Sequence, residues 1–153
     1  MLGDLTEQEV VEILENNIVG RIGCYDGTTP YIVPVSYLVQ EGHVLCHSRM
    51  GLKIEMMRRN PNVCFEVDEI RDYNNWRCVI AWGEYNELVD EKEIEAAKAY
   101  FSEYMLTSKT SKTAEPPEGQ ANRQHPDQKT GDETPIFYKI EFTKITGRFE
   151  KQV

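Results

Sequence analysis

The stretch "PYIVPVSYLVQEGHVLCHSRMGLK" (residues 30–53) decides the predicted fold, because it holds two strands and the start of a helix. An apolar run over 30–39 stops at "QEGH" and resumes over 44–48, which is typical of two antiparallel strands joined by a turn. Proline lacks the N–H that a ladder needs, so Pro34 predicts an edge or a bulge. Residues 51–60 then form a short predicted helix, which Asn60-Pro61 ends.

The runs on either side extend this pattern into a mainly β domain. We predict further strands over 18–24, 62–69, 76–89 and 135–150, and helices over 5–17 and 90–105. Asp26-Gly27 marks a hairpin turn, and residues 78–82 are apolar enough for that strand to be covered on both sides. Six or seven antiparallel strands with short capping helices in so short a chain favour a small closed barrel. We therefore expect one domain over 1–153.

Residues 107–134 differ in composition, since they have almost no apolar side chain and are rich in Pro, Gly, Thr and Lys. A polar segment of this length predicts a long loop. Two interpretations stay open, a lid over a binding site and an insertion without a function.

The charge balance excludes some classes of partner. The chain has 153 residues, 26 of them acidic and 17 basic, and its formal net charge is -9. Binding to nucleic acid or to an anionic membrane requires basic surface, so we expect neither. No apolar run reaches membrane-spanning length, and the start "MLGDLTEQE" does not resemble a signal peptide, so we expect a cytoplasmic protein. The cysteines at 24, 46, 64 and 78 form no C-x-x-C pair and are interpreted as reduced, buried thiols without a metal.

The predicted corner between strand 44–48 and helix 51–60 has the chemistry of an anion site. The first amides of a helix have no partner within the helix and lie at the positive end of its dipole. A lysine in the first turn, here Lys53, is unfavourable by about a few tenths of a kcal/mol unless an anion is present. Ser48 adds a neutral donor. The alternative is a helix start that binds nothing.

Four segments in order resemble the pyridoxamine 5'-phosphate oxidase-like flavoproteins, and most of all their nitroimidazole-resistance branch. They are "GRIGCYDGTTPYIVPVSY", "VLCHSRMGLK", "RRNPNVCFEV" and "WRCVIAWGEYNEL". The resemblance implies a split β-barrel and a homodimer that binds FMN, rather than FAD, between its subunits. The anion at the corner would then be the flavin phosphate.

The same resemblance implies the site residues. Ser48 and Lys53 would hold the phosphate, and His47 is the candidate catalytic residue. The strand along the flavin ring would contain Val33, Pro34, Val35 and Ser36. The aromatic side chain near the ring edge would be Trp76. Relatives often have a second cation directly before the matching lysine, where this chain has Leu52. Either Arg49 or Arg58 substitutes for that cation, or the phosphate binds less tightly. From the residues alone, His47 is as compatible with a satisfied, non-catalytic histidine, and Trp76 with core packing.

No G-x-S-x-G, P-loop or G-x-G-x-x-G motif occurs, so in an enzyme the flavin would carry the chemistry. The resemblance implies an oxidoreductase that reduces a small acceptor such as a nitroimidazole. NADH and NADPH are candidate electron donors, and the sequence does not identify the physiological one. Alternatives are a flavin carrier, store or redox sensor without turnover, a pyridoxamine phosphate oxidase-type enzyme, and a flavin-free interaction domain.

Overall fold

The computed structural model describes residues 1–107 and 134–153. The predicted polar loop over 107–134 therefore lies, apart from its end residues, outside the described residues. The chain divides into two compact units, one of Met1–Glu87 with Pro135–Val153 and one of Leu88–Thr134. The second unit contains helix α3 (Glu91–Thr107), and the strands and the other helices belong to the first.

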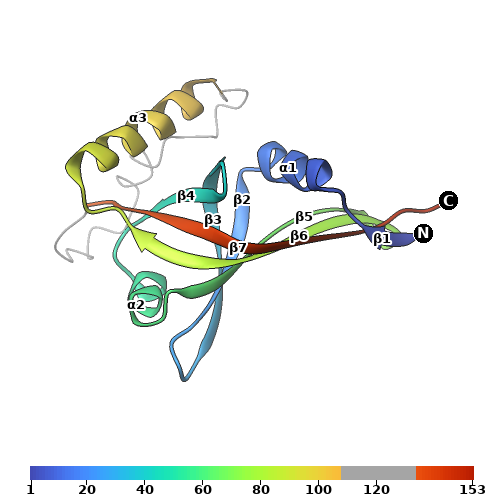
Figure 1. Cartoon of the computed structure of the whole chain (residues 1–153), viewed down its shortest axis with the longest axis horizontal. Coiled ribbons are helices and arrows are strands. Elements are labelled where there is room, and N and C mark those ends of the chain that lie inside the picture. Colours follow the sequence, from blue (N-terminus) through green and yellow to red (C-terminus); the bar gives the residue numbers. More distant parts are fainter. Residues whose placement is uncertain (108–133) are drawn as a thin grey trace, which may run out of the picture. The chain divides into compact units, whose positions relative to one another are not determined.

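The first unit is an antiparallel β-barrel (Figure 1). Its strands are β1 (Leu2–Asp4), β2 (Val19–Tyr25), β3 (Pro30–Gln40), β4 (His43–Ser48), β5 (Asn62–Asp72), β6 (Asn75–Glu87) and β7 (Ile136–Glu150). The sheet order is β1-β7-β4-β3-β2-β5-β6, and β7 also pairs with β6, so six strands close into a ring and β1 extends it. The mainly β, antiparallel prediction is confirmed.

Two helices pack on this barrel unit, α1 (Glu7–Asn16) and α2 (Leu52–Arg59). A capping box starts α1, because the Thr6 hydroxyl accepts the Glu9 N–H (3.2 Å) while the Glu9 carboxylate accepts the Thr6 N–H (2.8 Å). α1 buries Val10, Ile13 and Leu14 in the core. The buried Tyr37 hydroxyl donates to the Leu14 carbonyl (2.7 Å) and ties α1 to β3.

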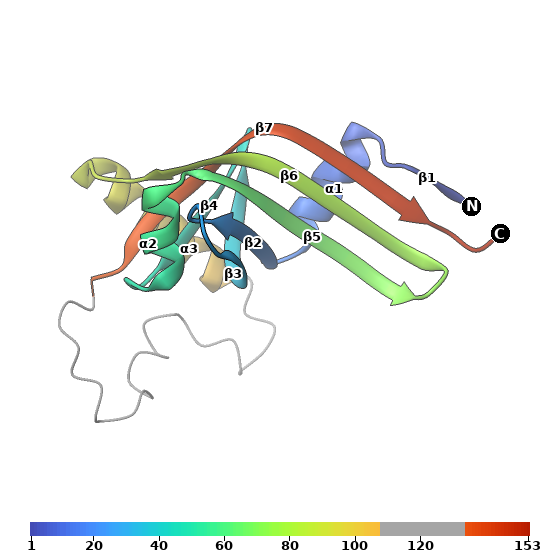
Figure 2. The same ribbon diagram turned by 90° about the horizontal axis from the view of Figure 1, so that it is seen from below.

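The predicted strands over 62–69 and 76–89 leave residues 70–75 as a polar loop, and this part of the prediction is wrong. β5 runs to Asp72 and β6 begins at Asn75, so the two strands form one long hairpin, which runs beside β7 in Figure 2. The turn is closed locally, since the Asp72 carboxylate accepts the Asn74 N–H and the Asn75 side-chain amide, both at 2.9 Å. Its composition is polar because this part of the ladder lies at the surface.

The expectation that β6 is covered on both sides is met on one side only. Val79 and Ala81 are buried in the core, but Ile80 is 37% and Trp82 41% exposed. The cysteines are free thiols, as predicted, although Cys64 and Cys78 are only half-buried. Among the described residues, no helix has both the length and the apolar composition to cross a membrane.

Candidate functional site

Strands β3 and β4 part at the point where the sequence predicts the site. β3 pairs with β4 only from Tyr37 to Gln40, whereas its residues 30–36 pair with β2 alone. The Tyr37 N–H donates to the Ile18 carbonyl (3.1 Å), so by alternation Val33 and Val35 turn their backbone groups toward β2. Pro34 and Ser36 then face the open edge. The edge that the proline predicts is confirmed, and it leaves backbone groups available for a ligand.

The first turn of α2 has no side-chain cap. Gly51 is the N-cap residue in an extended conformation, and among the described residues no side-chain cap bond is formed at this helix start. Its carbonyl accepts the Glu55 N–H (3.1 Å) and begins the helix. A Cβ at Gly51 would meet no atom nearer than 4.0 Å. Backbone donors and open space therefore coincide here, as an anion would require.

Lys53 is half-buried in this first turn. Burial is the main cause that lowers its pKa, and the nearby Cys46 thiol acts weakly in the opposite direction. In the part of the chain that the structure describes, its ammonium has no ion pair and no hydrogen bond. A half-buried cation without an acidic partner, in a chain of net charge -9, is a place where an anion would be stabilised.

Ser48 and His47 end β4 on opposite faces. Ser48 shares the face of Cys46, and its hydroxyl donates to the Arg49 carbonyl (2.9 Å). His47 lies opposite Phe137, with 5.8 Å between ring centroids. Burial, and then the charge of Lys53, lower the His47 pKa, so the neutral ring predominates at neutral pH. The structure thus brings His47 into the field of Lys53, but not onto the face of Ser48.

The cation that relatives often place directly before the lysine matching Lys53 has no direct replacement in α2. Leu52 occupies that position and is 55% exposed. Arg58 is engaged elsewhere, because its guanidinium donates to both carboxylate oxygens of Glu87 at 2.8 and 3.0 Å. Glu87 also accepts from the Tyr85 hydroxyl (2.6 Å). We assign Arg58 to this structural network and not to a phosphate.

Trp76 lies far from the other predicted site residues of the same chain. Its indole N–H donates to Glu150 (3.2 Å), opposite it at the end of β7. Ser48, in contrast, pairs with Ile136 at the start of β7. At about 3.3 Å per residue, these two ends of β7 are roughly 45 Å apart. One chain therefore does not bring Trp76 to Lys53, and its predicted role needs a second chain.

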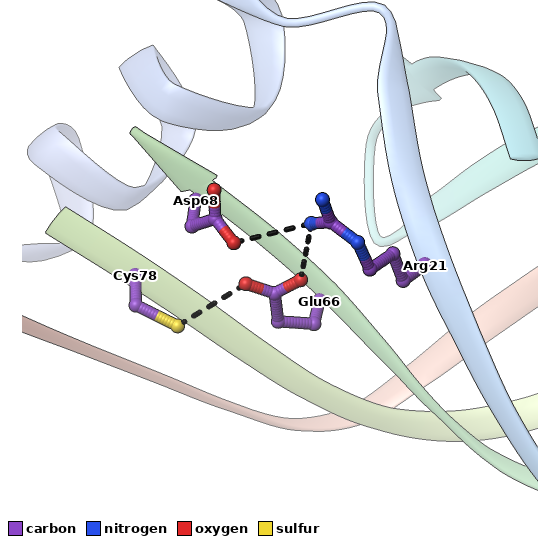
Figure 3. A network of polar contacts seen from close by, with 4 residues as sticks. All are labelled: Arg21, Glu66, Asp68 and Cys78. Carbon is purple, nitrogen blue, oxygen red and sulfur yellow. Dashed lines mark hydrogen bonds and ion pairs between the residues drawn. The ribbon is translucent and has the colours of Figure 1, made fainter. Parts of the chain in front are cut away.

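Sequence reasoning missed a charged network on the outer face of the sheet (Figure 3). The Arg21 guanidinium donates to Glu66 (3.2 Å) and to Asp68 (3.1 Å), and the Cys78 thiol lies 3.5 Å from the other oxygen of Glu66. Burial, and then Asp68, raise the pKa of Glu66. Strand alternation in β5 is enough to predict that Glu66 and Asp68 face outward. No residue near them in the sequence indicates that they bind Arg21 of β2.

The barrel leaves one edge of β3 open, close in the chain to the start of α2, where Lys53 has no acidic partner among the described residues. The family model described as pyridoxamine 5'-phosphate oxidase matches residues 6–149, and the chain belongs to this family.

Similar proteins agree with this assignment. A protein of Rhizobium meliloti (strain 1021) is 26% identical over 144 residues, which cover 94% of this chain and 92% of that protein. The structure of an FAD-binding protein from Mesorhizobium loti has a TM-score of 0.73 at 26% identity and covers 99% of this chain and 98% of its own. The split-barrel prediction is thereby confirmed.

A structure from Bacteroides thetaiotaomicron, named for 5-nitroimidazole antibiotic resistance, has a TM-score of 0.68 at 18% identity, covering 97% of this chain and 87% of its own. At that identity it shows the fold alone, so the nitroimidazole-resistance branch stays a prediction.

Proposed function

We propose that the chain binds a flavin nucleotide at the β4–α2 corner and uses it to reduce a small acceptor such as a nitroimidazole. The observation that carries this proposal is the half-buried Lys53, which has no acidic partner and lies at a helix start without a side-chain cap, both among the residues that the structure describes. A flavin phosphate supplies the missing negative charge and accepts from the first-turn amides. Ser48 can turn its hydroxyl from the Arg49 carbonyl to a phosphate oxygen.

The open edge of β3 fits the flavin ring. Pro34 and Ser36 direct their free backbone groups away from β2, so these groups can satisfy the polar edge of the ring. The inward side chains of Val33 and Val35 belong to the barrel, which keeps this edge rigid. His47, neutral at neutral pH, can donate or accept a hydrogen bond beside the site. When bound, a flavin supplies the transfer of hydride or electrons, which none of these side chains performs.

FMN is the form that the resemblance to the flavoprotein family implies. The Mesorhizobium loti protein and a protein from Mycobacterium smegmatis are both described as FAD-binding. Both nucleotides carry a phosphate next to the ribityl chain, so Lys53 and Ser48 suit either. Release of the flavin from purified protein by heat, followed by chromatography against FMN and FAD, decides between them.

We propose that the flavin lies between the subunits of a homodimer. The open β3 edge belongs to the barrel surface, and a single copy leaves Trp76 roughly 45 Å from the corner along β7. In a dimer the strand over Trp76–Trp82 of the other copy can cover the ring. Sedimentation of the flavin-loaded protein tests this, and a monomer that keeps its flavin contradicts it.

Turnover separates an enzyme from a flavin carrier, store or sensor, because the same residues bind the cofactor in each. We expect NADH or NADPH to bleach the flavin bands under anaerobic conditions, and a nitroimidazole to restore them with consumption of the nitro compound. Bleaching and recovery that leave the nitro compound intact would favour the sensor or carrier. A pyridoxamine phosphate oxidase-type activity needs further cations for the substrate phosphate, and Arg77 is already bound to Glu69 (2.6 Å).

A further inference from the structure

Two exposed apolar side chains flank the start of α2. Met50 comes directly before Gly51 and is 46% exposed, and Leu52 comes directly after it and is 55% exposed. Neither is needed for the core, because the buried side of the helix is formed further along, by Ile54, Met56 and Met57. Single apolar side chains on a surface are ordinary, but these two adjoin the place where the anion would lie.

The surface between these two side chains is open. Among the described residues, and apart from the chain neighbours of Gly51, a Cβ built on this glycine would meet no atom nearer than the Arg49 carbonyl oxygen, at 4.0 Å. The Gly51 backbone is extended, with φ of -175°, so its conformation does not require glycine. A glycine that the backbone does not require still lets a ligand approach the chain closely. The open surface therefore has room for more than a terminal phosphate.

The first turn of α2 carries no net charge. Lys53 contributes one positive charge, and the exposed Glu55 contributes one negative charge. Arg49, outside the helix, already interacts with another group of the chain. The phosphate of FMN is a monoester with close to two negative charges at neutral pH, whereas each phosphate of FAD is esterified on both sides and carries about one. A turn with one lysine and one carboxylate compensates the esterified phosphate better.

We propose that the corner holds an esterified phosphate, with the flavin on one side of it and a nucleoside packed on Met50 and Leu52 on the other; this rests on the flavin binding proposed above. The ligand class is a flavin dinucleotide, of which FAD is the example. FMN ends at its phosphate and would leave both apolar side chains in water. FAD continues past the phosphate to an adenine, whose flat ring can cover them.

Burial of the two apolar side chains supplies the preference for the dinucleotide. Covering the exposed part of one leucine or methionine side chain corresponds to about a threefold to tenfold gain in affinity. Ordering of the nucleoside on the surface offsets part of this gain. With Met50 and Leu52 together, we expect FAD to bind at least about fivefold more tightly than FMN.

Calorimetric titration of riboflavin, FMN and FAD into the flavin-free protein tests the preference. Leu52→Ala removes most of one apolar contact without a change of charge, and we expect its dissociation constant for FAD to rise about threefold to tenfold. Its dissociation constant for FMN should stay within about twofold. Val11→Ala is the matched control, because Val11 is 48% exposed on α1, a different helix (Figure 1), and both dissociation constants should be unchanged.

The outcomes separate this inference from the proposed function. Unaltered protein that binds FMN as tightly as FAD overturns the dinucleotide and leaves the flavin site intact. Equal losses of FMN and FAD affinity in Leu52→Ala overturn it as well, because a contact with the nucleoside cannot affect FMN; a thermal unfolding scan equal to that of the unaltered protein excludes misfolding as the cause. Unaltered protein that binds none of the three flavins overturns the proposed function itself.

Discussion

Lys53→Met separates a ligand-binding lysine from a structural one. Methionine keeps most of the side-chain volume but removes the ammonium. A charge-assisted contact with a phosphate contributes roughly 1.5–3 kcal/mol, so we expect the flavin dissociation constant to rise roughly tenfold to 150-fold. Fluorescence titration of flavin into the flavin-free protein measures it. Lys98→Met is the control, because Lys98 has an acidic partner, Glu95 (3.5 Å).

The stability of the flavin-free variant should change in the opposite direction. Burial lowers the pKa of Lys53, so its charged form destabilises the fold at neutral pH, and this cost is lost only as the pH rises from the folded-state pKa toward 10.5. Lys53→Met should therefore unfold in urea at a concentration equal to or above that of the unaltered protein. A variant that is clearly less stable, or one that binds flavin unchanged, would refute the reasoning.

Three further outcomes follow from individual contacts. Leu52→Lys restores the cation of relatives at an exposed position, and we expect it to tighten binding of a phosphate-bearing flavin by about three- to tenfold in low salt, but not of riboflavin. Tyr37→Phe removes the 2.7 Å hydrogen bond to the Leu14 carbonyl and should lower the free energy of unfolding by about 1–2 kcal/mol in urea titrations, whereas Tyr25→Phe at the exposed hairpin should change it little. Burial lowers the His47 pKa below 6.5. The stability that the neutral His47 ring contributes should therefore be fully present above pH 6.5 and be lost as the pH falls through the folded-state pKa. His47→Gln should flatten this dependence of the unfolding temperature on pH in thermal scans.

Local patterns predicted most of the barrel. In the sequence, the alternation of Val63, Phe65 and Val67 indicates which face of β5 is buried, and the capping-box spacing of Thr6 and Glu9 indicates where α1 begins. Both signals depend on residues within one strand or one helical turn, where side-chain direction follows directly from backbone geometry. Pro34 likewise identified the strand edge, because a missing N–H can be tolerated only where no neighbouring strand needs it.

Contacts between distant segments could not be predicted in the same way. Nothing near Arg21 in the sequence indicates that it binds Glu66 and Asp68, which are more than forty positions away. The distance of Trp76 from the corner depends on the length and register of β7, which composition does not give. The β5–β6 hairpin was missed because its turn is polar, although the ladder continues to Asp72 and Asn75.

The contribution of the phosphate to flavin affinity, measured with and without Lys53, tests the central claim most directly. Binding of riboflavin and of the flavin nucleotide that the protein retains would be compared in the unaltered protein and in Lys53→Met. We predict that the nucleotide binds the unaltered protein at least about tenfold more tightly than riboflavin, and that this ratio falls roughly tenfold or more in Lys53→Met, with riboflavin affinity unchanged. The same ratio in both proteins would contradict the assignment of the phosphate to this corner.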